Sequence, residues 1–231
     1  MNLPIAMHIP DGFLANDVAA AAALLAVVAV GYALVVAGRA LDEDRVPLLG
    51  VLAAFIFAVQ MINFPVAGGT SGHLLGATLA AVLLGPWLAC LVMSVVLATQ
   101  AFVFADGGIT ALGANVLNMG VLGALLAGAI VGGVLRVLPR TRTAYLGLVG
   151  ATAWLAVMTG AAATAAELAM SETVPLATVL PAMLGVHTLI GIGEAVITVA
   201  AISAVMASRP DLLAFAPPNE NRLGHAAPLG A

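Results

Sequence analysis

The stretch LATVLPAMLGVHTLIGIGEAVITVAAISAVMA, residues 176–207, is an apolar run that contains a single charged residue, Glu194. A helix needs only about 20 apolar residues to cross a bilayer, so this run predicts a transmembrane helix. Further apolar segments lie between polar or Gly/Pro-containing breaks, at 16–38, 47–64, 72–84, 87–105, 113–138 and 143–170. The pattern predicts an all-α, polytopic membrane protein with seven transmembrane helices in one domain.

The composition of the whole chain supports this fold class. Of the 231 residues, 63% are hydrophobic and 8% are charged, and the mean hydropathy is +1.16. A soluble domain carries about a quarter charged residues, so we expect lipid to cover most of the surface. The single cysteine, Cys90, offers neither a disulfide framework nor a thiolate metal cluster.

The seven positive side chains are all arginines, and their positions predict the orientation in the membrane. They form three groups in the sequence: Arg39 and Arg45, then Arg136, Arg140 and Arg142, then Arg209 and Arg222. With seven helices, all three groups fall on one side of the membrane. The positive-inside rule places that side in the cytoplasm. We therefore expect an outside N-terminus, a cytoplasmic C-terminus and a loosely ordered cytoplasmic tail.

The third apolar segment is too short to cross the bilayer, since residues 71–84 would rise about 20 Å as a helix against a hydrocarbon core of about 30 Å. The preceding residues 65–72 are predicted to dip below the membrane surface, where irregular backbone must be buried or line a cavity. Ser71 is the expected N-cap of this helix, which places His73 in its first turn. The positive end of the helix would keep that imidazole neutral, the state that binds metal.

The predicted topology puts His8, Asp11, His73, Asp106 and Glu172 on the outer face. Imidazole is the commonest side-chain ligand for nickel, cobalt, copper and zinc, so the two histidines indicate a metal site. The alternative is that each histidine is simply a polar residue at the membrane interface.

The seventh segment carries His187 and Glu194 on roughly the same helix face, and the cost of exposing ionisable groups to lipid predicts that both point inward. They would form a second shell or relay beneath the site, or else a packing hydrogen bond between helices. Asn63 leads into the 65–72 loop and could orient it. The other amides in the helices, Gln60, Gln100, Asn115 and Asn118, are expected to bond across helices.

Several motifs together resemble the CbiM/NikM family, the substrate-capture (S) components of energy-coupling factor importers for cobalt and nickel. The resemblance covers residues 7–207 and implies a seven-helix protein with an outside N-terminus, in agreement with the arginines. It is carried by MHIPDGFL (7–14), NFPVAGGTSGHL (63–74), LGP (84–86), FADGGITALG (104–113) and IGEA (192–195).

This resemblance implies a metal held by the amine of Met7, the amide nitrogen and imidazole of His8, and the imidazole of His73. Such a nitrogen plane suits Ni(II) and equally Cu(II). The family motif starts the chain, whereas Met1–Ala6 precede it here. An internal Met7 has no free amine, so our hypothesis is that translation starts at Met7 or that the extension is trimmed. Otherwise His8, His73 and a carboxylate such as Asp11 would form a different site.

The function implied by the resemblance is capture of Co²⁺ or Ni²⁺ at the outer face of a prokaryotic cell membrane, for cobalamin synthesis or for nickel enzymes. The sequence does not separate cobalt from nickel. We expect the chain to divide into three parts: an extension or mis-assigned start at residues 1–6, the membrane domain at 7–208 and the cytoplasmic tail at 209–231.

The implied partners are a transmembrane coupling protein, two ATPases and a small auxiliary membrane subunit, with no nucleic acid. The chain itself has no phosphate-binding loop and no lysine, so we expect a transporter component rather than an enzyme, with no catalytic cofactor.

Two other functions are compatible with parts of the sequence. An S component for an organic vitamin would need an aromatic-lined pocket, but aromatic residues make up only 5% of the chain. Gly69–Gly72 has the Gly-x-Ser-Gly form of rhomboid intramembrane proteases, with Ser71 as nucleophile and His187 as base. This short motif is a weak signal in a glycine-rich chain.

Overall fold

The computed structural model describes residues 8–40, 45–62, 64–66, 70–137, 139 and 141–216, with backbone alone at 40, 64–66 and 70–72. The elements follow in the order α1 (Asn16–Ala40), α2 (Val46–Gln60), β1 (Phe64–Val66), β2 (Thr70–Gly72), α3 (Ala77–Leu84), α4 (Pro86–Phe104), α5 (Leu112–Asn115), the π-helix η2 (Val116–Leu122), α6 (Gly123–Val134), α7 (Arg142–Met170), α8 (Leu176–Ser208) and the 3₁₀-helix η3 (Pro210–Leu212).

The prediction of a helical membrane protein is confirmed, because every predicted apolar segment contains a helix. Within the described residues, five helical stretches are long and apolar enough to cross a membrane: Asn16–Arg39, Pro86–Phe104, Leu112–Val134, Arg142–Met170 and Leu176–Ser208. Helix α2, with 15 residues, is apolar but shorter. Large side chains such as Leu24 and Val27 on α1 are 65% and 69% exposed, as expected of a lipid-facing surface.

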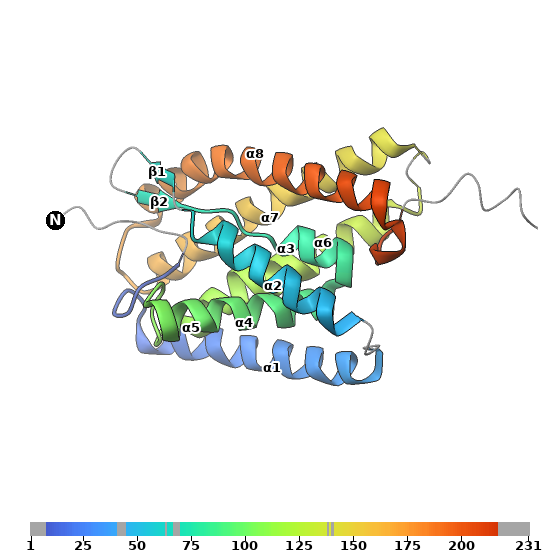
Figure 1. Cartoon of the computed structure of the whole chain (residues 1–231). Helices are drawn as coiled ribbons and strands as arrows, with labels where there is room; N and C mark the ends of the chain where they lie inside the picture. Colours follow the sequence, from blue (N-terminus) through green and yellow to red (C-terminus); the bar gives the residue numbers. More distant parts are fainter. Residues whose placement is uncertain are drawn as a thin grey trace, which may run out of the picture.

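The short helix α3 forms the centre of the bundle. All its residues from Ala77 to Leu84 are buried, and it packs against α4, α6 and α7. Figure 1 shows the long helices lying roughly along one axis with α3 and α6 between them. A helix that is apolar all round is typical of such a position.

The predicted start of the third helix is wrong. Helix α3 begins at Ala77 after the N-cap Gly76, whose φ of 83° is left-handed, so Ser71 is not the cap and His73 is not in the first turn. Residues 73–76 instead run as a non-helical segment, which we call the His73 segment. The physical reason is that the amides of Leu75 and Gly76 are bound by a side chain from α8, described below, rather than by local capping.

The residues before the His73 segment contain a small antiparallel hairpin that the sequence did not predict. Strand β1 pairs with β2, with Phe64 opposite Gly72 and Val66 opposite Thr70. The pairing satisfies main-chain groups that would otherwise be unbonded at this depth. The hairpin lies at the same end of the bundle as the start of α8 (Figure 1).

The first part of the expected tail is also more ordered than predicted. After α8, the amides of Ala214 and Phe215 both donate to the carbonyl of Val82, at 3.0 and 3.2 Å. The hydroxyl of Tyr145 on α7 donates to the carbonyl of Phe215 at 2.7 Å. Residues 210–216 therefore close the end of the bundle over α3, and residues 217–231 lie outside the described structure.

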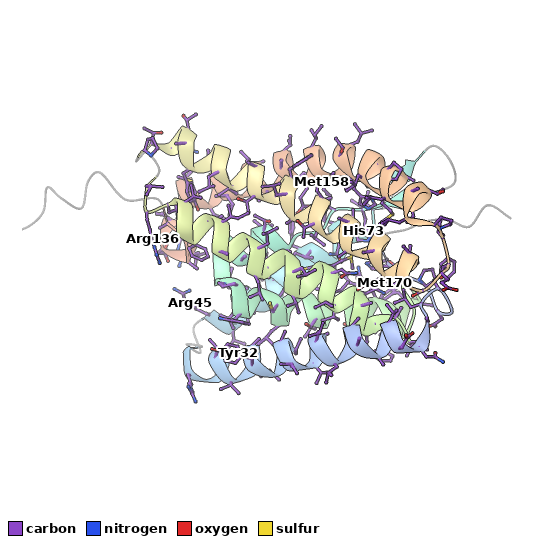
Figure 2. All side chains as sticks on the ribbon, turned by 180° about the vertical axis from the view of Figure 1, so that it is seen from behind. Tyr32, Arg45, His73, Arg136, Met158 and Met170 are labelled. Atoms are coloured by element: carbon purple, nitrogen blue, oxygen red, sulfur yellow. The ribbon has the colours of Figure 1, made fainter. Side chains whose placement is uncertain are left out.

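The arginines in the described structure gather at one end of the bundle. Arg39 ends α1, Arg45 precedes α2, Arg142 begins α7 and Arg209 follows α8. Figure 2 shows Arg45 and Arg136 toward one end and His73 and Met170 toward the other. This distribution agrees with the one-sided arrangement expected from the sequence, and it separates the arginines from the candidate site.

Candidate metal centre

The structure brings His8 and His73 together. The rings of His8 and His73 meet edge to face, with centroids 4.5 Å apart and an angle of 82° between their planes. Their exposed fractions are 4% and 3%, so neither is a solvated interface residue. The predicted convergence of these residues is thus present in the fold, although they lie far apart in the sequence.

Both imidazoles present an unbonded nitrogen inside the protein. Nδ1 of His73 lies 2.8 Å from the carbonyl oxygen of Leu74, and Nδ1 of His8 lies 3.3 Å from the carbonyl oxygen of Asp106. A carbonyl oxygen can only accept, so we assign the ring proton to Nδ1 in each case. Each Nε2 then carries a free lone pair. Within the described structure both Nε2 atoms are buried without a hydrogen-bond partner. A histidine oriented in this way through one nitrogen is the usual form of a metal ligand.

The environment of His73 keeps its ring neutral. It lies outside the helices that are long enough to span the membrane. Burial lowers the pKa of His73 to about 3, and the neighbouring His8 adds to the shift. The imidazole is therefore uncharged at neutral pH, which is the state that binds a metal. The prediction of a neutral ring is correct, but the cause is burial rather than a helix end.

Asp106 accepts a hydrogen bond from Nδ1 of His8. Its carboxylate Oδ1 also lies 3.3 Å from Nδ1 of His8, and the hydrogen bond lowers the pKa of Asp106. Asp106 thus orients the histidine, in keeping with its predicted place around the site.

The segment 8–11 is held against the Asp106 loop by main-chain contacts. The amide of Gly108 donates to the carbonyl of Ile9 at 2.9 Å. A Cβ at Gly108 would lie 2.4 Å from the amide nitrogen of Asp11, so no larger residue fits without displacing the chain. Two loops that are distant in sequence therefore share one surface.

Asp11 acts as a link between these loops rather than as a neighbour of the histidine nitrogens. Its Oδ1 accepts from the amide of Thr110 at 2.7 Å and from the hydroxyl of Thr110 at 2.6 Å. These hydrogen bonds lower the pKa of Asp11, which is exposed.

Helix α8 carries the other two predicted residues. His187 and Glu194 are 1% and 3% exposed, which confirms that both point inward. Nδ1 of His187 lies 2.7 Å from the carbonyl of Met183, so its buried Nε2 is also free. Glu194 accepts from the amides of Leu75 and Gly76 at 2.8 and 2.7 Å.

Two amides have a role that the sequence did not reveal. Asn115 accepts from the amide of Ile9 at 2.8 Å and donates to the carbonyl of the same residue at 3.2 Å. Gln60 donates to the carbonyl of Leu75 at 2.6 Å. Gln60 also accepts from Nε2 of Gln100 on α4, so its predicted bond across helices is confirmed. The sequence did not reveal that both amides also bind main chain within two residues of a histidine. In the sequence, the only indication of this role is that each amide lies near the end of an apolar segment, close to a loop.

Three predicted site residues are not tested by this geometry. Met7 and Asn63 lie outside the described residues, and only the backbone of Ser71 is described, in β2. Among the residues that are described, no three His, Cys, Asp or Glu side chains lie together as a metal cluster. Among the described residues, His8 and His73 are therefore two side-chain donors rather than a complete metal site.

The fold and site define a multi-pass membrane protein with a buried pair of facing imidazoles at one end of a helical bundle. The family model for the cobalt uptake substrate-specific transmembrane region, CbiM, matches residues 8–212. The chain belongs to this family.

Similar proteins include metal transporters. The fused nickel transport protein NikMN of Rhodobacter capsulatus is 40% identical over 90% of this chain, which spans 64% of that protein. The cobalt transport protein CbiM of Sorangium cellulosum is 36% identical over 90% of this chain and 94% of its own. A crystal structure of a truncated transition metal transporter has a TM-score of 0.80 and 31% identity, covering 87% of this chain and 98% of that chain. These relatives are transport proteins, so they lend no support to the protease interpretation of Ser71.

Proposed function

We propose that this protein captures Ni²⁺ or Co²⁺ at the outer face of a prokaryotic membrane as the substrate-binding component of an energy-coupling importer. The observation that carries the proposal is the contact between two buried imidazoles, His8 and His73, with Nε2 of His73 free of any partner in the described structure. Borderline-soft divalent ions of this kind favour imidazole donors. The relatives named for nickel and for cobalt support the choice of cargo.

The remaining donors would come from the main chain before His8. A free amine at Met7, the amide nitrogen of His8 and Nδ1 of His8 would form fused chelate rings, because a histidine closes such a ring with its own amide only through Nδ1. Nδ1 of His8 would then leave Asp106 when the metal binds, and Nε2 of His73 would complete a plane of four nitrogens. This arrangement requires a chain that starts at Met7. N-terminal sequencing of the purified protein tests it: an intact Met1 would rule out the amine as a ligand.

The transport cycle would need other subunits. Fusion of the corresponding region to a further segment in the nickel relative supports partnership with other transport components. The partners we propose are a transmembrane coupling protein, two ATPases and a small auxiliary subunit. Co-purification of the chain with these subunits, expressed together, tests this part independently of metal binding.

The direct test of capture is calorimetric titration of the metal-free chain in detergent with Ni²⁺ and with Co²⁺. We expect binding by the natural chain and none by His73→Ala, because one of the two side-chain donors is lost. His225→Ala, which removes a histidine outside the proposed site, is the matched control and should bind normally. Unchanged binding by His73→Ala would refute the site.

A further inference from the structure

We propose that Asn115 and Glu194 are positioning residues that set the separation of His8 and His73 by binding the main chain within three residues of each histidine. Neither residue would donate an atom to the metal. The inference rests on the proposed function, and it explains how two non-helical segments present a site of fixed geometry.

The first anchor acts on the His8 side. Asn115 precedes the π-helix η2 and bonds both main-chain groups of Ile9, the amide through Oδ1 and the carbonyl through Nδ2. Ile9 is 1% exposed, so the anchor lies inside the protein. A two-point contact of this kind fixes the direction of the chain as well as its position. The residue before Ile9 is His8, whose Cα therefore has little freedom.

The second anchor acts on the His73 side in the same way. Glu194 binds the amides of Leu75 and Gly76, while Gln60 binds the carbonyl of Leu75. Both polar groups of Leu75 are thus held by side chains from two different helices, α8 and α2. Residues 73–75 lie outside any helix or strand, and Gly76 joins α3 through the hydrogen bond that its carbonyl accepts from the amide of Ala80 at 3.0 Å.

A chain of hydrogen bonds joins the two sides. Nε2 of Gln100 on α4 donates to Oε1 of Gln60 at 2.9 Å. The carbonyl of Gln100 accepts from the amide of Asp106 at 3.0 Å, and Asp106 orients His8. Leu75 and His8 are therefore connected through α4, independently of direct contact between the rings.

The anchors matter because metal sites tolerate little error. A metal–imidazole bond is about 2.0–2.1 Å long, and a site must be held to within about 0.5 Å of its productive geometry. The competing explanation is that these side chains only satisfy buried main-chain groups and so contribute to folding alone. The two explanations differ in what happens to bound metal in a folded variant.

The test uses exchanges of nearly equal size. The carboxylate of Glu194 accepts hydrogen bonds from two main-chain amides. In Glu194→Gln, the side-chain NH₂ group faces one of these two N–H groups, so one hydrogen bond is lost. Asn115→Asp turns a carboxylate oxygen toward the carbonyl of Ile9. The matched controls are Glu167→Gln and Asn118→Asp, since this buried pair is bonded at 2.7 Å between α7 and η2 and contacts neither histidine segment through its hydrogen bonds.

Each full-length variant is purified in detergent, checked for cooperative thermal unfolding and titrated with Ni²⁺ and Co²⁺. The visible spectrum of bound Co²⁺ reports the coordination geometry. We expect both site variants to bind about 10-fold or more weakly, by analogy with the loss of groups that orient metal ligands, and to change the Co²⁺ spectrum. The controls should stay within about twofold of the natural affinity, with an unchanged spectrum.

If Glu194→Gln does not fold, Gln60→Met replaces it, because this change removes only neutral hydrogen bonds, the one to the carbonyl of Leu75 and the one from Gln100. Natural affinity and spectrum in both site variants would overturn the inference. Equal losses in the control variants would also overturn it, because the effect would then be general. Failure of the natural chain to bind either ion would instead count against the proposed function, so the two failures are distinguishable.

Discussion

Asp106 contacts Nδ1 of His8 through two of its oxygens, the main-chain carbonyl and the carboxylate Oδ1, each at 3.3 Å. The ring is therefore held by a loop that comes 98 residues later in the chain. The contact turns Nε2 of His8 toward the interior, where His73 presents the same nitrogen. The orientation of the candidate ligand is thus a property of the Asp106 loop as much as of the N-terminal segment.

The first prediction concerns this orientation. Asp106→Asn keeps the size of the side chain and the main-chain carbonyl but removes the negative charge beside the Nδ1 proton. We expect Ni²⁺ to bind about 10-fold or more weakly, because the carboxylate no longer holds the ring in place before the metal arrives. Calorimetric titration measures the change. Natural affinity in this variant would show that the carbonyl alone orients the ring.

The second prediction concerns the close approach of two loops. Gly108→Ala would place a methyl group 2.4 Å from the amide nitrogen of Asp11, so the N-terminal segment must move. We expect a loss of about 1–3 kcal/mol in stability, together with weaker metal binding.

Gly31→Ala on α1 is the control for this change, because nothing lies within 4 Å of its added methyl group. Alanine favours the helix by about 0.5–1 kcal/mol, so this variant should be as stable as the natural chain or more so. Thermal unfolding in detergent compares the two. A Gly108→Ala variant as stable as Gly31→Ala would contradict the close packing of the loops.

The third prediction is a pH dependence of the metal-free protein. The pKa of His73 falls from 6.5 to about 3 on folding, so below pH 6.5 the unfolded chain binds a proton that the folded chain does not. This contribution to stability is complete above pH 6.5 and decreases as the pH falls toward 3, by up to about 1.4 kcal/mol per unit.

The measurement is the thermal unfolding midpoint at about pH 7.5 and about pH 5, in the natural chain and in His73→Asn. The natural chain should lose more stability on acidification, because the variant has no imidazole to protonate at this position. His8 and His187 are present in both proteins and cancel in the comparison. Equal losses would mean that His73 is not buried as described.

The fourth prediction concerns orientation. In a Cys90→Ala background, single cysteines replace Glu172, in the turn between α7 and α8, and Ser208, at the end of α8; both positions are exposed. A membrane-impermeant maleimide should label Glu172→Cys in intact cells and Ser208→Cys only in inverted vesicles, because arginines occupy the latter end. The opposite labelling pattern would reverse the topology and place the candidate site on the cytoplasmic side.

Parts of the site were predictable from local sequence. His8 and His73 stand out because histidines are rare in this chain, and the seven-residue spacing of His187 and Glu194 places both on one helix face. The roles of Asn115 and Gln60 were not predictable in the same way. An amide in an apolar helix indicates a hydrogen bond, but its partner is decided by which loop folds back onto it, and that loop can lie anywhere in the chain.

The sequence by itself determined the fold class and the end of the bundle at which charge collects. Apolar runs must be helical in lipid because each main-chain group needs a partner, and arginines are confined to one side. Only the tertiary structure decided where the third helix begins, because Glu194 binds the amides of Leu75 and Gly76 and holds the His73 segment outside the helix. It also decided that the rings of His8 and His73 meet, since that contact depends on anchors from four helices rather than on any local pattern.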